Sequence, residues 1–94
     1  MQKEQNENLM DASLYGHADD VRLLIAKGAK VNAENKNGNT ALMRASFYGH
    51  TDVVQLLIDA GANVNAVSKD GTTALMRASD KGHTDVVQLL KESK

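Results

Sequence analysis

Residues 38–61 read GNTALMRASFYGHTDVVQLLIDAG, and residues 71–94 read GTTALMRASDKGHTDVVQLLKESK. Of the 24 aligned positions 17 are identical, without a gap, at an offset of 33 residues. The same register reaches back towards the start of the chain, where Met10, Ser13 and Gly16 match the residues 33 positions later. A fixed period of this length is typical of a solenoid, in which each unit buries its apolar face only against its neighbours. The repeat therefore predicts a single array of stacked units whose function lies on its surface.

Composition limits the classes of partner. The 94 residues suffice for one domain, and with one Phe and two Tyr its core must come from Leu, Val, Ile, Met and Ala. A net charge of -1 argues against a phosphate-binding surface, so we expect no nucleic-acid partner. The lack of cysteine excludes disulfides, thiolate metal sites and cysteine nucleophiles. No apolar run reaches the roughly 20 residues of a membrane span, and the start MQKEQNEN is no secretory signal. We expect no membrane contact and a cytoplasmic location.

Each unit is predicted to be a pair of short helices. In the first unit they span residues 9–15 and 19–27, and the preceding residues 1–8 are either a solvated first helical turn or a frayed tail. Thr40 and Thr73 precede ALMRAS and can cap the first amides of a helix, while Gly28 occupies a typical left-handed helix end. The second helices, DVVQLLIDA and DVVQLLKES, are apolar on more than one side, as expected of helices packed on both flanks. We place Leu56 in the core.

The loops between units contain strong turn signals. Val31 lies between Lys30 and Asn32 and suggests a short extended piece. The pairs 37–38 (Asn-Gly) and 70–71 (Asp-Gly) favour tight turns, because these residues tolerate positive φ.

The two ends depart from the repeat. The first repeat has Glu7, Asn8, Asp11 and Asp20 where the second has Thr40, Ala41, Arg44 and Val53. One flank of the first unit is thus more polar, as a capping repeat requires. At the other end Ile58, Ala60 and Gly61 become Lys91, Ser93 and Lys94, while Met76, Val86, Val87, Leu89 and Leu90 are kept. The last unit is therefore expected to expose apolar surface at the open end of the stack.

These features together resemble the ankyrin repeat: a 33-residue period, T-x-L at a helix start, G-H between two helices, V-x-L-L, and G-A-x-V-N-A before the next turn. The family's usual T-P-L-H reads T-A-L-M here at residues 40–43 and 73–76. The resemblance implies an all-α ankyrin-repeat solenoid, an elongated stack of three helix-turn-helix units with projecting loops and β-turns. Its expected divisions within one domain (1–94) are a capping repeat at 5–37, an internal repeat at 38–70 and a truncated repeat at 71–94.

The near-identity of the repeats, together with polar end caps, favours an engineered or consensus-type array. Recently duplicated natural repeats would have the same features, so both origins stay open.

The polar residues of the repeats point to structure rather than chemistry. Successive histidines (His17, His50 and His83) are one repeat apart, about 8–10 Å by helix packing. Two ligands of one zinc ion each lie about 2 Å from it and therefore within roughly 4 Å of one another. We expect no metal site, and predict that these histidines bond the backbone of the adjoining loop. Ser46 and Ser79 are predicted to bond back to a helix carbonyl. No base is placed to activate them, so we predict neither an enzyme nor a cofactor, and Asn32 and Asn65 are taken as structural.

Most partner-binding candidates are positions that differ between repeats, because stacking explains the others. On the helices they are Leu14, Tyr15, Arg44, Phe47, Tyr48, Arg77, Asp80 and Lys81. We expect Arg44 and Arg77 to project from the first helices of their repeats, with Lys81 nearby. On the loop tips, where the resemblance implies partner contacts, the candidates are Glu34, Lys36, Asn37, Asn39, Val67, Lys69, Asp70 and Thr72. Solvent-facing aromatics are typical interface anchors, although Leu14 and Phe47 could equally fold back on their own hairpins. The tyrosines are the better candidates for exposure.

The predicted function is noncovalent recognition of another protein through the concave face of the first helices and the loop tips, with no small-molecule substrate. The alternative is a self-assembling homo-oligomer or a structural scaffold without a separate target.

Overall fold

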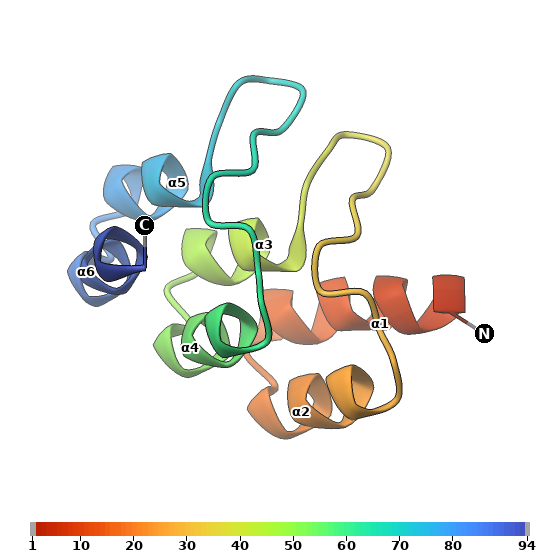
Figure 1. Ribbon diagram of the computed structural model, residues 1–94. Helices are drawn as coiled ribbons and strands as arrows, with labels where there is room; N and C mark the ends of the chain where they lie inside the picture. Colours follow the sequence, from red (N-terminus) through yellow and green to blue (C-terminus); the bar gives the residue numbers. More distant parts are fainter. Residues whose placement is uncertain (1, 94) are drawn as a thin grey trace.

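The computed structural model describes residues 2–93, and this part of the chain folds into six helices with no strand (Figure 1). The helices are α1 (Gln2–Tyr15), α2 (Ala18–Ala26), α3 (Ala41–Phe47), α4 (Thr51–Asp59), α5 (Ala74–Asp80) and α6 (Thr84–Glu92). One row contains α1, α3 and α5, the other contains α2, α4 and α6, and both loops project on the same side of the stack. The predicted all-α solenoid is confirmed. Met1 and Lys94, the ends of the predicted domain, lie outside the described residues.

Local hydrogen bonds begin and end the helices as predicted. The hydroxyl of Thr40 accepts from the Met43 amide at 3.3 Å, and Thr73 does the same for the Met76 amide at 3.2 Å. At the end of α4, the amide of Gly61 donates to the carbonyl of Ile58, and the amide of Ala62 donates to the carbonyl of Leu57. This pairing is the Schellman motif, which needs a left-handed residue, and Gly61 has a φ of 97°.

One local prediction was wrong: Val31 lies in a turn instead of an extended piece. Helix α1 begins at Gln2, so the helical alternative for the polar start is correct, and the helix extends further than one turn before residue 9. The turn predicted at 37–38 is present. It is closed by a hydrogen bond from the Gly38 amide to the Asn35 carbonyl, and its positive φ is at Gly38.

The core runs through the middle of the stack. Its largest fully buried side chains are Leu9, Leu42, Met43, Leu57, Leu90, Val21, Val53, Val54 and Val86. The prediction that placed Leu56 there was wrong by one residue: Leu57 is fully buried, while Leu56 packs half-buried against the core. A helix sandwiched between two others has an apolar pattern too broad to fix its most buried side from sequence. Within residues 2–93, no helix combines the length and apolarity needed to cross a membrane.

Two of the three histidines bond the backbone, as predicted, but the acceptor lies at the end of a helix in the preceding repeat and not in the adjoining loop. Nε2 of His50 lies 2.8 Å from the carbonyl oxygen of Leu14, and Nε2 of His83 lies 2.9 Å from that of Phe47. Within the described residues no repeat precedes His17, which lies exposed beside Asp20. Asn32 is structural as well, because its side chain donates to the Gly61 carbonyl and accepts from the Asn63 amide.

The prediction for the helix serines was wrong. The hydroxyl of Ser46 is buried without a hydrogen-bond partner in the described part of the chain, as is that of Ser13. Ser79, at the equivalent position of the third repeat, is exposed.

Candidate partner-binding hollow

A hollow lies where the two projecting loops meet the first helices of the second and third repeats. It has a volume of about 660 Å³, and we call it the Arg77 hollow. Its lining residues are Asn37, Asn39, Phe47, Lys69, Asp70, Thr72, Arg77, Asp80 and Lys81. All nine belong to the candidates predicted from sequence. Stacking therefore brings into one place residues of two loops and two helices.

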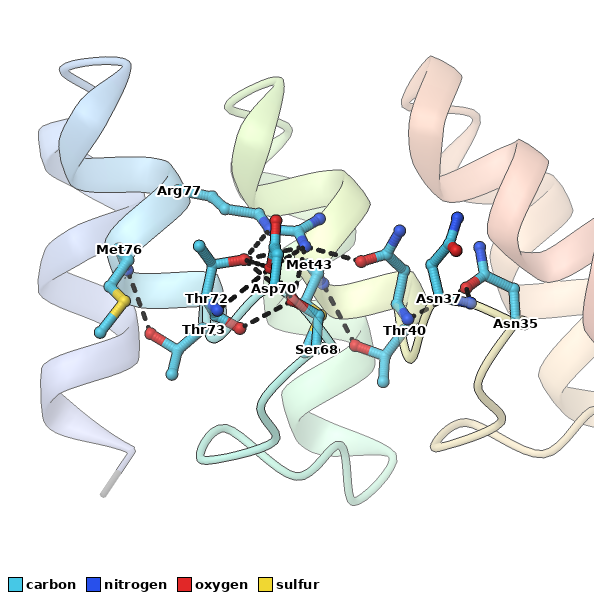
Figure 2. A network of polar contacts seen from close by, with 11 residues as sticks. Asn35, Asn37, Thr40, Met43, Ser68, Asp70, Thr72, Thr73, Met76 and Arg77 are labelled. Carbon is cyan, nitrogen blue, oxygen red and sulfur yellow. Dashed lines mark hydrogen bonds and ion pairs between the residues drawn. The ribbon is translucent and has the colours of Figure 1, made fainter.

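Arg77 forms the floor of this hollow. From the sequence we had expected its side chain to project from the helix instead, and that prediction was wrong. Figure 2 shows its side chain running from α5 towards both loops. Nη2 donates to Asn39 Oδ1 at 2.6 Å and to Ser68 Oγ at 3.2 Å, while Nε donates to Thr72 Oγ1 at 3.1 Å. Only 17% of the side chain is exposed. The guanidinium thus ties the loop before α3 to the loop before α5.

Asp70 organises the turn above this floor. One of its carboxylate oxygens accepts from the hydroxyls of Ser68 and Thr72 and from the Thr72 amide. The hydrogen bonds from Ser68 and Thr72, with a smaller contribution from the Arg77 charge 4.0 Å away, hold the pKa of Asp70 below its ordinary value. Asp70 is therefore ionised at neutral pH, and its charge is already engaged by its own turn.

Sequence reasoning missed Ser68, which is buried at the base of this turn. Its hydroxyl joins Asp70, Thr72 and Arg77 in one network (Figure 2). The available signal was its position two residues before Asp70, a spacing at which short polar side chains hydrogen-bond across a turn.

The helix side of the hollow carries an aromatic ring and both signs of charge, from Phe47, Asp80 and Lys81. Nζ of Lys81 lies 4.8 Å from the centroid of the Phe47 ring, within range of a cation–π interaction. Phe47 is half-buried, and its ring packs edge-on against the Tyr48 ring with 4.8 Å between the ring centroids. Phe47 is therefore neither fully exposed nor completely folded back on its own hairpin. Among the side chains that the structure describes, no carboxylate pairs with Lys69 or Lys81. Two cations are thus available to a ligand at this site.

The remaining candidates are not gathered in the hollow. Tyr48 is exposed, as predicted, and so are Glu34, Lys36 and Val67 on the loops. Leu14 and Arg44 are half-buried, and Nε of Arg44 has no hydrogen-bond partner among residues 2–93.

Tyr15 is exposed as predicted, and lies 65% exposed at a second hollow of about 320 Å³ between α1 and α2. Asp11 and Asp20 line this second hollow, which therefore has the opposite charge to the Lys69 and Lys81 side of the first.

Neither hollow resembles a metal centre. Across residues 2–93, no group of three or more His, Asp or Glu side chains is arranged to hold a metal ion.

Comparison with known proteins identifies the repeat. The family model of ankyrin repeats (3 copies) matches residues 9–94. No curated protein matches the chain.

Proposed function

Because the chain belongs to the ankyrin-repeat family, whose repeats generally mediate protein–protein interactions, we propose that it binds a partner protein through the Arg77 hollow. Ankyrin repeats are typically not enzymes, and the proposed activity is recognition without a chemical step.

The observation that carries this proposal is the coincidence of two independent criteria. Most candidates vary between otherwise near-identical repeats, and nine candidates line one concave surface. Seven of these nine, all except Lys69 and Arg77, differ from the equivalent residue of the neighbouring repeat. Stacking requires the invariant positions, so variation is tolerated where side chains face a ligand instead of a neighbouring repeat.

The chemistry of the hollow suits a polar segment of a folded or extended protein. Arg77 and its partners hold the loops in place, so little ordering is needed on binding. Lys69 and Lys81 offer unpaired charge, and the Phe47 ring offers apolar area beside them. A partner that places a carboxylate between the two lysines would use all three groups.

The test uses two equivalent lysines as a matched pair. Lys69 lines the hollow, and Lys36, its counterpart 33 residues earlier, does not. Protein ligands would be selected by display against the purified wild-type chain, and their Kd measured for Lys69→Ala, Lys81→Ala and Lys36→Ala. We expect the first two to weaken binding and the third to leave it unchanged. Equal binding by all three folded variants would overturn the proposal.

Two further expectations stay predictions. These are the engineered or consensus-type origin of the array and its cytoplasmic location.

A further inference from the structure

The outward face of the third repeat has the same residues as a surface that is buried in the first two repeats. We define this open face by its residues Met76, Ser79, Gly82 and Val87. The second repeat has the same four residue types at the equivalent positions Met43, Ser46, Gly49 and Val54. Helices α5 and α6 lie at one end of the stack in Figure 1, and no other helix among residues 2–93 covers their outward side.

Burial shows what the open face lacks. The methionine at this position is 8% exposed in the first repeat (Met10), 1% in the second (Met43) and 49% in the third (Met76). Val54 is fully buried, whereas Val87 is only half-buried. In the first two repeats the next hairpin covers these side chains.

The glycine before each histidine marks how the next hairpin docks. A Cβ added at Gly16 would lie 2.6 Å from Nδ1 of His50, and one added at Gly49 would lie 2.6 Å from Nδ1 of His83. Each histidine therefore packs directly on the glycine backbone of the preceding repeat. Gly82 has the same φ of 74°, and within the described residues nothing lies within 4 Å of its Cβ position.

We propose that the open face binds one further helical hairpin, supplied by another protein of the same repeat type. The incoming hairpin places a histidine over Gly82 and within reach of the Asp80 carbonyl, the counterpart of the Leu14 and Phe47 carbonyls. This interface continues the two that already join the repeats, and it is separate from the Arg77 hollow.

The first repeat of a second copy does not meet the requirements of this face, although it carries His17. Ala41 and Val53, on the side of the second repeat that faces the first, are buried. Asn8 and Asp20 occupy the equivalent positions and are exposed. Burying an unpaired carboxylate and an amide against an apolar face is costly. The occupant therefore carries small apolar residues at these two positions.

The chain itself can be converted into such a partner. In a donor variant, Asn8→Ala and Asp20→Val give the first repeat the residues of the second, and Gly82→Asn blocks the donor's own open face. Asparagine tolerates the left-handed backbone, while its Cβ occupies the place of the histidine ring. The wild-type chain is the acceptor.

We expect donor and acceptor to form a one-to-one complex by analytical ultracentrifugation. Gly82→Asn in the acceptor should weaken it about tenfold or more, because the histidine can no longer pack there. His17→Ala in the donor should also weaken it, and Lys36→Ala in the acceptor should leave it unchanged.

Several results would overturn the proposal. One is the lack of a complex with a donor shown by circular dichroism to be folded. If the first donor fails to fold, a second donor keeps the test decisive. It carries only Asp20→Val on its docking face, together with Gly82→Asn. Another is a complex insensitive to Gly82→Asn in the acceptor. A wild-type dimer abolished by Met76→Lys would show that a second copy occupies the face instead.

Discussion

Nε2 of His83 lies 2.9 Å from the carbonyl oxygen of Phe47, and this bond joins the third repeat to the end of helix α3. A carbonyl oxygen can only accept, so Nε2 carries the proton. Replacing His83 with alanine leaves this carbonyl unpaired and should lower the free energy of unfolding by about 1–3 kcal/mol. Urea denaturation measures the change.

His17→Ala is the matched control for this substitution. His17 has the same place in its repeat but is exposed, so its replacement should change stability by less than about 0.5 kcal/mol. Equal effects of the two substitutions would contradict the stacking role of His83.

Gly49→Ala and Gly82→Ala separate backbone strain from packing. Both glycines have a φ of 74°, and an alanine there costs about 1–2 kcal/mol from the left-handed backbone alone. At Gly49 the added methyl also collides with the His83 ring. We expect Gly49→Ala to lower the melting temperature clearly more than Gly82→Ala. If the two shifts are the same, the histidine does not pack on Gly49 in solution.

Ser46→Ala should stabilise the protein. It removes a buried hydroxyl without a partner in the described part of the chain, and such a group costs about 1 kcal/mol or more. Ser79→Ala, at the exposed equivalent position, should have little effect. Thermal unfolding of both variants checks the expectation, and a destabilised Ser46→Ala would show that the hydroxyl has a bonding role.

Asp70 should contribute a pH-dependent stability. Its pKa is lowered in the folded state, chiefly by the Ser68 and Thr72 hydrogen bonds. The stabilisation is therefore present above the unfolded-state pKa of about 4 and is lost as the pH falls through the lowered folded-state value.

Asp70→Asn tests this dependence, because Asn37 occupies the equivalent turn of the second repeat. The variant keeps an acceptor oxygen and loses the titration. The difference in urea midpoint between wild type and variant should shrink as the solution is acidified below pH 4 or so. A difference that is constant with pH would mean that the hydrogen bonds do not favour the ionised form.

Leu57→Ala should cost about 2–5 kcal/mol, because Leu57 is fully buried between neighbouring helices. Leu56→Ala, next to it in α4, should cost less, since Leu56 is only half-buried. Urea unfolding of the pair measures the order, and the reverse order would show that α4 is rotated from its described position.

Nine of the candidate residues predicted from the sequence lie in one hollow, but the sequence did not indicate how each side chain is used. Phe47, Asp80 and Lys81 could be chosen because they vary while the rest of the repeat does not. Arg77 was wrongly expected to project, because its partners Asn39, Ser68 and Thr72 lie in two separate loops. No local pattern reveals that these loops converge on one guanidinium.

The sequence alone determined the all-α repeat, the threonine caps, the left-handed glycines at helix ends and the backbone-bonding role of His50 and His83. These features depend on bonds within a repeat or on the fixed 33-residue translation between repeats, and both are visible in the order of residues. Only the tertiary structure decided that these histidines bond the preceding repeat, that Leu57 rather than Leu56 is buried, and that Ser46 lacks a partner among the described residues. It also decided which apolar residues of the last repeat are open to solvent, because Met76 is exposed while Val86 and Leu90 are buried. Each of these outcomes depends on the rotation of a helix against its neighbours or on which neighbour is present, and the order of residues alone does not reveal it.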